Sequence, residues 1–288
     1  MALRLITADE RLAKPRGVRA CIFGKSGIGK TSLLWTLPAE STQFIDLEAG
    51  DLAVQGWPGA SIRPRTWEEC RDLALFLAGP NPALRDDQPY SAAQHARVLQ
   101  EYGDPGQIAQ IGTLFIDSIT VSGRLCFQWC RGQPEAFSER TGKPDVRGAY
   151  GLHGREMIAW LTQLQHARGC NVIFVGILDE RTDDFNRRVF SPQIDGSKTG
   201  NELPGIVDQV ITMAEVKDES GAPQRALVCQ TINPWGFPAK DRSGRLDLLE
   251  PPHIGRLFEK ISGPARSAAE RRALPVTTAP DTTTTPST

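Results

Sequence analysis

One short glycine-rich stretch limits the folds open to this chain more than any other feature. Residues 24–31 read Gly-Lys-Ser-Gly-Ile-Gly-Lys-Thr, which matches the pattern of a phosphate-binding loop in full. A strand-like apolar run over residues 18–23 precedes the loop, and a helix-favouring stretch through Leu37 follows it. This order turns backbone N–H groups and the positive end of a helix toward a polyphosphate. The stretch therefore predicts a nucleotide-binding site.

The loop predicts a role for each of its residues. Lys30 is expected to hold the β- and γ-phosphates and to act in catalysis, and the Thr31 hydroxyl is expected to coordinate Mg²⁺. The predicted cofactors are therefore ATP and Mg²⁺. Lys25 has two interpretations: it is a solvated loop lysine, or it occupies the place of the signature lysine by which partition-type ATPases reach across a dimer. The residues expected to contact the nucleotide are Gly24, Lys25, Ser26, Gly27, Ile28, Gly29, Lys30, Thr31 and Ser32.

Strand-like and helix-like segments alternate along most of the chain. Such alternation predicts an α/β fold with a doubly wound, mostly parallel sheet. The predicted strands after the loop cover residues 43–47, 113–117 and 171–178. The predicted helices cover residues 66–77, 91–102, 118–130 and 154–168, and residues 131–150 are expected to form a mobile loop. Antiparallel edge strands or hairpins are expected over residues 207–216, 225–232 and 245–249.

Composition separates one large domain from two terminal segments. Residues 15–262 are expected to form the nucleotide-binding domain, in which the proline- and glycine-rich segment 79–112 is a predicted insertion outside the core. Residues 1–14 are expected to be an N-terminal extension. Residues 263–288 are rich in Thr and Pro and are expected to be a disordered tail, because they cannot bury enough apolar surface to offset the entropy lost on ordering.

Charge and hydropathy exclude several classes of protein. The 288 residues hold 33 Lys and Arg against 34 Asp and Glu, a net charge of −1, so no global basic surface points to nucleic acid. No apolar run approaches the ~20 residues that cross a bilayer, and the N-terminus lacks the apolar segment of a secretory signal. We therefore expect a cytoplasmic protein without a membrane partner.

Two acidic residues follow predicted strands and complete the expected site. Asp117 ends the strand 113–117, as the Mg²⁺-side aspartate of a phosphate-loop enzyme does. Many helicase- and chaperone-type ATPases carry their catalytic glutamate at the next position, but Ser118 stands there. Glu48 is the best candidate for that role, because it ends the strand after the loop helix and adjacent parallel strands place their carboxyl ends over one crevice. The sequence lacks the Asn/Thr-Lys-x-Asp motif that selects guanine.

Three segments in this order resemble the core of the RecA-like recombinases: residues 24–31, the run Phe-Ile-Asp-Leu-Glu over 44–48, and the run Phe-Ile-Asp-Ser over 115–118. The resemblance is closer to their compact bacteriophage relatives, the Sak-type single-strand annealing ATPases, which are often labelled phage nucleotide-binding proteins. Segments 203–208 and 239–242 also look like that family, and the resemblance spans roughly residues 15–260. It implies a RecA-like ATPase domain with Glu48 as catalytic glutamate and Asp117 as Mg²⁺-side aspartate.

The resemblance also implies contacts with single-stranded DNA. The loop over residues 180–200 corresponds to the DNA-contacting loop of the family, where arginines neutralise phosphates and an aromatic ring stacks on a base. A solvated polar loop, whose acidic residues offset the basic ones, is the alternative interpretation. The candidate DNA-binding residues are Arg181, Phe185, Arg187, Arg188 and Lys198.

Two further features of the family concern communication between sites. Its members carry a polar pair that senses the γ-phosphate, but Gly176 and Ile177 occupy those positions here, so Asp179 or Glu180 is the expected stand-in. The pair Lys240 and Arg242 is expected either to reach the γ-phosphate of a neighbouring subunit as trans fingers or to form surface ion pairs.

The sequence thus predicts a Mg²⁺-dependent ATPase of phage DNA recombination that anneals or exchanges single strands as a homo-oligomeric ring or filament. Its turnover is expected to be slow and DNA-stimulated, and its expected partners in the bacterial host cytoplasm are a single-strand binding protein or an exonuclease. The alternative is a nucleotide-switched loader or partition-like protein, in which ATP controls protein contacts and DNA takes no part.

Overall fold

The structure, a computed structural model, describes residues 5–7, 9–10, 16–104, 106, 110–167, 169–217 and 221–264. The predicted extension 1–14 and the predicted tail 263–288 fall largely outside these described residues. Ten strands within them form one sheet. The strands are β1 (Arg19–Gly24), β2 (Thr42–Asp46), β3 (Ser61–Ile62), β4 (Thr113–Asp117), β5 (Asn171–Thr182), β6 (Arg188–Pro192), β7 (Gln209–Lys217), β8 (Pro223–Val228), β9 (Lys240–Asp241) and β10 (Leu249–Glu250).

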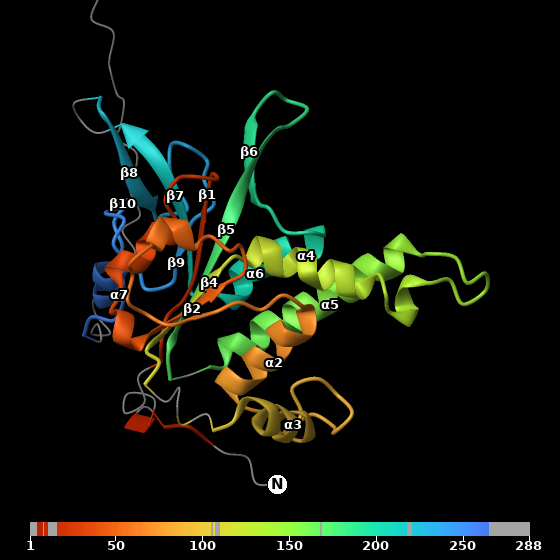
Figure 1. Cartoon of the computed structure of the whole chain (residues 1–288). Coiled ribbons are helices and arrows are strands. Elements are labelled where there is room, and N and C mark those ends of the chain that lie inside the picture. The colour runs from red at the N-terminus through yellow and green to blue at the C-terminus, as the bar shows by residue number, and fades with distance from the viewer. Residues whose placement is uncertain are drawn as a thin grey trace, which may run out of the picture.

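The strand order confirms the predicted architecture. The sheet runs β10-β8-β7-β1-β5-β4-β2-β3, with β6 paired to β5 and β9 paired to β7 (Figure 1). The pairs from β7 through β1, β5, β4 and β2 to β3 are all parallel. The strands β6, β8, β9 and β10 join antiparallel. The fold is therefore α/β with a mostly parallel sheet and antiparallel edge strands.

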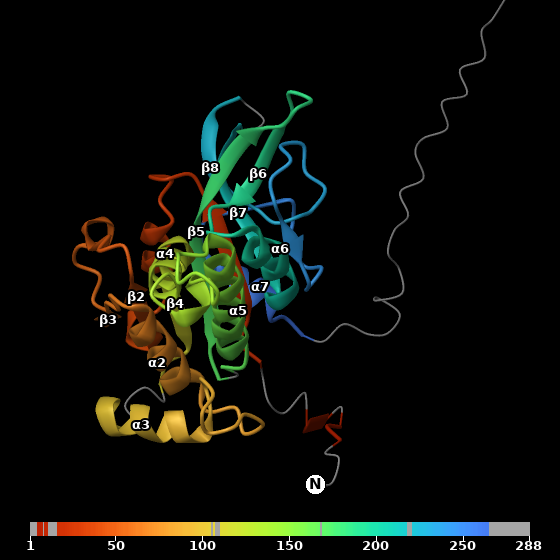
Figure 2. The same ribbon diagram turned by 90° about the vertical axis from the view of Figure 1, so that its right-hand side faces the viewer.

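Helices cover both faces of this sheet. The α-helices are α2 (Trp67–Ala78), α3 (Ala92–Tyr102), α4 (Ile119–Cys130), α5 (Val146–Gln165), α6 (Ser197–Ile206) and α7 (Ile254–Ile261). The 3₁₀ helices are η1 (Thr31–Thr36), η2 (Ala39–Ser41), η3 (Asp51–Val54) and η5 (Pro134–Ala136). Figures 1 and 2 show α2, α4 and α5 along one face, with α3 outside α2, and α7 on the other. No helix among the described residues is both long and apolar enough to cross a bilayer.

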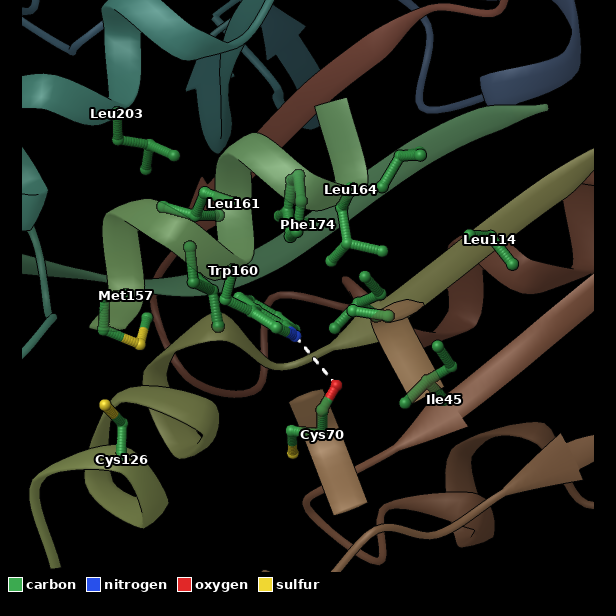
Figure 3. Packing of buried hydrophobic residues seen from close by; sticks show 14 of the residues in the cluster. Ile45, Cys70, Leu114, Cys126, Met157, Trp160, Leu161, Leu164, Phe174 and Leu203 are labelled. Carbon is green, nitrogen blue, oxygen red and sulfur yellow. Dashed lines mark hydrogen bonds between the residues drawn. The ribbon is translucent and has the colours of Figure 1, made fainter. Parts of the chain in front are cut away.

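Alternating side chains along β1 supply two hydrophobic cores. Cys21 and Phe23 pack in the core under α2, α4 and α5, whereas Ala20 and Ile22 pack in the core under η1 and α7. Every residue of β1 is buried, as expected for a central strand covered on both faces. In the first core, the indole Nε1 of Trp160 in α5 donates to a carbonyl oxygen of α2 at 3.0 Å (Figure 3).

Two predicted helix starts are confirmed by their caps. Thr66 Oγ1 accepts from the Glu69 N–H at 3.1 Å, and Glu69 Oε2 accepts from the Thr66 N–H at 3.2 Å, so α2 begins with a capping box. At α4, Ser118 Oγ accepts from the Val121 N–H at 3.3 Å. Both caps satisfy N–H groups that lack a partner in the first turn. Local sequence signals were therefore sufficient to predict where these two helices begin.

The prediction of a mobile loop over residues 131–150 is wrong at its C-terminal end, because α5 begins at Val146. Asp145 Oδ1 caps the helix by accepting from the Arg147 N–H at 3.0 Å. Gly148 disfavours a helix in the sequence, but a Cβ at this position would lie 2.0 Å from the Glu135 carbonyl oxygen. Glycine is therefore required by the close approach of η5, which sequence reasoning alone does not reveal.

The predicted loop over residues 180–200 is also corrected. β5 continues to Thr182 and forms an antiparallel hairpin with β6, in which Glu180 stands opposite Phe190, and α6 then begins at Ser197. Polar residues dominate this stretch because much of the hairpin is exposed, so its composition resembles that of a loop. We name residues 178–192 the β5–β6 arm; it projects away from the sheet in Figures 1 and 2.

Two smaller predictions need correction. Residues 79–112 are predicted to lie outside the core, but Tyr90 and Val98 are buried in the first core, and α3, which carries Val98, packs against α2. The helix after the glycine loop is the short 3₁₀ helix η1, and it ends before Leu37. Pro38 follows Leu37, and a proline ring disfavours helical backbone in the residue before it.

Candidate functional site

The glycine loop joins the carboxyl end of β1 to η1, as predicted. Gly27 and Gly29 have φ angles of +78° and +102°, which glycine adopts without strain. A Cβ at Gly24 would lie 2.7 Å from the Met213 carbonyl oxygen of β7, so the first glycine permits close approach of the neighbouring strand. The loop is therefore built from backbone conformations and contacts that larger side chains would disturb.

Lys30 is buried within this loop. Its Nζ donates to the carbonyl oxygens of Gly24 and Lys25, each at 2.9 Å. Burial lowers the pKa of Lys30, and the nearby carboxylates of Asp117 and Glu48 oppose that effect. The ammonium group thus lies at the centre of the loop, with two acids close enough to act on its charge.

Asp117 lies beside the start of η1. Thr31 Oγ1 donates to Asp117 Oδ2 at 2.5 Å, although 86 residues separate the two in the sequence. Burial raises the pKa of Asp117 to about 6; the hydrogen bond from Thr31 opposes this rise, and the charge of Glu48 adds to it. A hydroxyl and a buried carboxylate in contact form an oxygen donor set that suits a hard divalent cation such as Mg²⁺.

Glu48 reaches the same place from β2. β2 and β4 pair in register, with Asp46 opposite Asp117, and the Leu47 N–H donates to the Asp117 carbonyl oxygen at 2.7 Å. Ser118 Oγ donates to Glu48 Oε1, so the residue that caps α4 also holds the exposed glutamate. The geometry brings together Lys30, Thr31, Asp117 and Glu48, the four residues for which the sequence predicts catalysis or metal binding.

Sequence reasoning missed two polar residues beside this group. The sequence predicts Ser118 as the start of a helix and as the residue that replaces a glutamate, but it predicts no contact with Glu48, to which the Ser118 hydroxyl donates. Asp46 is buried next to Asp117 and accepts from the Gly50 N–H at 3.0 Å and from Arg63 Nε at 3.0 Å. The position of Ser118, a capping residue directly after a strand, is a sequence signal by which it could have been found. No local sequence signal indicates that Arg63, in a later segment, neutralises Asp46.

Lys25 pairs within its own chain. Its Nζ lies 2.9 Å from Glu180 Oε2 on the β5–β6 arm, and Glu180 Oε1 lies 3.5 Å from Arg188 Nε. The side chain of Lys25 is 67% exposed, so this ion pair is accessible to solvent. Asp179 and Glu180 are the residues expected to stand in for the γ-phosphate-sensing pair. Glu180 contacts the glycine loop through Lys25, whereas Asp179 Oδ2 lies 2.7 Å from Arg181 Nε.

The positions of Gly176 and Ile177 are apolar and tightly packed. A Cβ at Gly176 would lie 2.7 Å from Phe23 Cε1 and 2.9 Å from Ile119 Cγ2. The Ile177 N–H donates to Thr120 Oγ1 at 3.1 Å. This part of β5 is therefore a packing element between β1 and α4.

The candidate DNA-binding residues divide between two elements. Arg181, Phe185, Arg187 and Arg188 belong to the β5–β6 arm, whereas Lys198 lies on α6, where its side chain approaches Gly154 of α5. Phe185 is 77% exposed at the turn, and the Arg187 guanidinium lies 5.1 Å from its ring centroid. The three arginines of the arm each pair with an acid: Asp179, Asp183 or Glu180.

The predicted trans fingers lie far from the glycine loop of their own chain. β9, which holds Lys240, pairs with the first residues of β7, and these pair with the amino-terminal half of β1. Lys240 Nζ donates to the carbonyl oxygens of Pro204 and Val207, the latter at 2.9 Å, and Arg242 Nη1 pairs with Asp208 Oδ1 at 2.9 Å. Within the chain, both residues tie β9 to the end of α6.

Comparison with known proteins gives a family for most of the chain. The sequence profile of the family described as AAA domain matches residues 16–243. A solved ATPase from the type III secretion system of pathogenic bacteria is 18% identical, with a TM-score of 0.37 over 69% of this chain and 51% of its own, so this chain spans about half of its length. The solved RadB recombinase is 13% identical, with a TM-score of 0.34 over 76% of this chain and 84% of its own. No curated protein sequence matches this chain.

Proposed function

Because this chain belongs to the AAA domain family of nucleotide-binding ATPases, we propose that it binds ATP at residues 24–32 and hydrolyses it with Glu48. One observation carries this proposal. The ammonium group of Lys30, the hydroxyl group of Thr31, and the carboxylates of Asp117 and Glu48 come from separate elements and lie together at the carboxyl ends of β1, β2 and β4. In an open α/β sheet, this end of the strands is where ligands bind.

We assign a role in ATP hydrolysis to each of these side chains from its position. Lys30 exchanges its two loop carbonyls for phosphate oxygens and balances the charge that develops during in-line attack on the γ-phosphate. Glu48 orients the attacking water through its carboxylate. Ser118 is a positioning residue, because its hydroxyl group fixes the direction of that carboxylate.

Mg²⁺ fits the oxygen atoms of Thr31 and Asp117, and these two residues would hold it. Burial of Asp117 without a cation makes its carboxylate an unusually weak acid for an aspartate, and a divalent cation would reverse that effect. When bound with ATP, Mg²⁺ supplies positive charge against the β- and γ-phosphates. The residues present therefore match the predicted metal dependence.

The second part of the proposal is that the β5–β6 arm contacts single-stranded DNA. Phe185 offers an exposed ring for stacking, and its neighbours Arg181, Arg187 and Arg188 are more than two-thirds exposed. Their ion pairs with acids of the arm are exposed pairs, which contribute little and exchange readily for phosphate contacts. Glu180 links this arm to Lys25 of the glycine loop, which supports coupling between nucleotide and DNA.

The wider role that we propose is annealing or exchange of single strands during phage DNA recombination, by a slow, DNA-stimulated ATPase that resembles the Sak-type proteins. Such a role uses a homo-oligomer, in which Lys240 and Arg242 reach a neighbour's γ-phosphate, and places the protein in the host cytoplasm with a single-strand binding protein or an exonuclease. These residues lie away from their own glycine loop, so any contact they make with a γ-phosphate is made between subunits.

The ATPase rate with and without single-stranded DNA, at low and high salt, tests both parts of the proposal. We expect stimulation by DNA that fades as salt rises, because phosphate contacts release counterions. The Arg187→Ala/Arg188→Ala variant should lose most of the stimulation and of the DNA affinity. The matched control removes two exposed arginines from the segment after α4, Arg131→Ala/Arg140→Ala, and should bind DNA as the wild type does. A hydrolysis rate that is the same with and without DNA would instead favour the alternative function, a nucleotide-switched loader or partition-like protein.

A further inference from the structure

Arg225 of β8 lies against the glycine loop, although it is about 195 residues away in the sequence. A Cβ placed on Gly29 would lie 3.1 Å from Nη1 of Arg225 and 3.9 Å from its Cζ. The same point lies 3.8 Å from the terminal methyl group of Met213 on β7. The guanidinium group thus occupies the space beside the last glycine of the loop, which directly precedes Lys30.

The sheet register explains how the side chain reaches this position. β8 pairs antiparallel with β7, with Leu227 opposite Met213 and Arg225 opposite Glu215. Residues two apart on a strand point to the same face, so Arg225 shares the face of Leu227. Leu227 and Met213 belong to the core that also contains Leu33 of η1. The side chain of Arg225 therefore lies on the η1 face of the sheet and reaches the glycine loop at the carboxyl ends of the parallel strands.

The charge of Arg225 has no protein partner within the part of the chain that the structure describes. The side chain makes no hydrogen bond or ion pair there, and Glu215, its cross-strand neighbour, does not pair with it. Three other basic residues of the described site are each engaged: Lys25 pairs with Glu180, Lys30 donates to two loop carbonyls, and Arg63 pairs with Asp46. An exposed guanidinium group beside a loop shaped for phosphate, and not neutralised by an acid, has the chemistry of an anion ligand.

From this geometry we propose that Arg225 binds the phosphate chain of the nucleotide from within the same subunit. The proposal rests on nucleotide binding by the loop and adds a residue that the loop pattern does not contain. Guanidinium groups bind phosphate oxygens through two parallel N–H donors, a geometry that a lysine ammonium does not provide. The antiparallel edge of the sheet thereby takes part in the site, because β8 supplies a cation in addition to the lysines of the loop.

Equilibrium binding of ATP, ADP and inorganic pyrophosphate to the full chain tests this assignment. Arg225→Gln should weaken binding of all three by about tenfold, which is the effect of losing one charge-assisted contact. Arg225→Lys should recover part of the loss, since it keeps the charge and loses the planar fork. The matched control is Arg85→Gln, in the exposed segment between α2 and α3, far from β8 in Figure 1; it should leave all three affinities unchanged.

The outcomes separate this inference from the proposed function. Equal affinities for the wild type and Arg225→Gln would overturn the assignment while leaving nucleotide binding intact. Loss of ATP and ADP affinity with unchanged pyrophosphate affinity would also overturn it, because the arginine would then contact the nucleoside instead of the phosphates. A wild-type chain that binds none of the three ligands would refute nucleotide binding itself. Circular dichroism of each variant checks that the fold is retained.

Discussion

Asp117→Asn should stabilise the protein in the absence of nucleotide and metal while removing its Mg²⁺-dependent hydrolysis. Asp117 is only 3% exposed, and burial raises the pKa of its carboxyl group to about 6. An asparagine keeps the shape of the side chain and an oxygen that accepts the hydrogen bond from Thr31. The variant therefore removes the charge and little else.

The magnitude and its pH dependence follow from linkage. An ordinary aspartate has a pKa of ~3.9, so holding the charged form of Asp117 in the folded state costs about 3 kcal/mol, at about 1.36 kcal/mol for each unit by which the folded and unfolded pKa values differ. The folded-state pKa is raised, so the cost is absent well below pH ~3.9, grows between pH ~3.9 and about 6, and is fully present above that range. The variant should gain about 3 kcal/mol at pH ~8 and about 1 kcal/mol at pH ~4.5.

Urea unfolding of the metal-free and nucleotide-free protein at these two pH values measures the effect. Asp184→Asn is the matched control, because Asp184 is an exposed acid of the β5–β6 arm; its free energy of unfolding should change by less than about 0.5 kcal/mol. A wild type as stable as the Asp117→Asn variant at pH ~8, or a difference that does not shrink toward pH ~4.5, would refute the reasoning. In either case the burial of Asp117 would not oppose its charge.

Two further predictions concern neighbouring residues. Ser118→Ala should lower kcat by about tenfold to a hundredfold with unchanged ATP affinity, because Glu48 loses the hydroxyl group that directs its carboxylate. Ser118→Thr keeps a hydroxyl group and should retain the rate. Steady-state kinetics in which Ser118→Ala changes KM alone would contradict this prediction. Gly176→Ala should destabilise the fold by about 1–3 kcal/mol in urea unfolding, because its Cβ would lie 2.7 Å from Phe23, and an unchanged midpoint would show that β1 and α4 have room to move.

The sequence predicted those parts of the site that depend on local spacing. The glycine loop, the acid that ends β4 and the acid that follows β2 are each recognised from a few consecutive residues, and the parallel sheet brings them together. The helix starts at Ser118 and Thr66 were predictable for the same reason, since caps are local. The roles of Lys30 and Glu48 remain predictions that the geometry supports.

Features that depend on long-range packing were not predictable. The early start of α5 depends on contact between Gly148 and η5, and the sequence around Gly148 favours a loop. The polar composition of residues 180–192 led to the prediction of a loop instead of the hairpin of the β5–β6 arm, because an exposed hairpin does not need alternating apolar residues. Arg225 reaches Gly29 only through the register of two antiparallel strands, which no motif encodes.

A comparison of ATP binding and single-turnover hydrolysis in the Glu48→Gln variant tests the central claim most directly. The account predicts wild-type ATP affinity with hydrolysis slowed by at least about a hundredfold, since the amide does not activate water as the carboxylate does. Glu40→Gln, the same change at an exposed glutamate of η2, should hydrolyse ATP at the wild-type rate, whereas Lys30→Ala should lose hydrolysis altogether. Near-normal hydrolysis by the Glu48→Gln variant would contradict the assignment of this site.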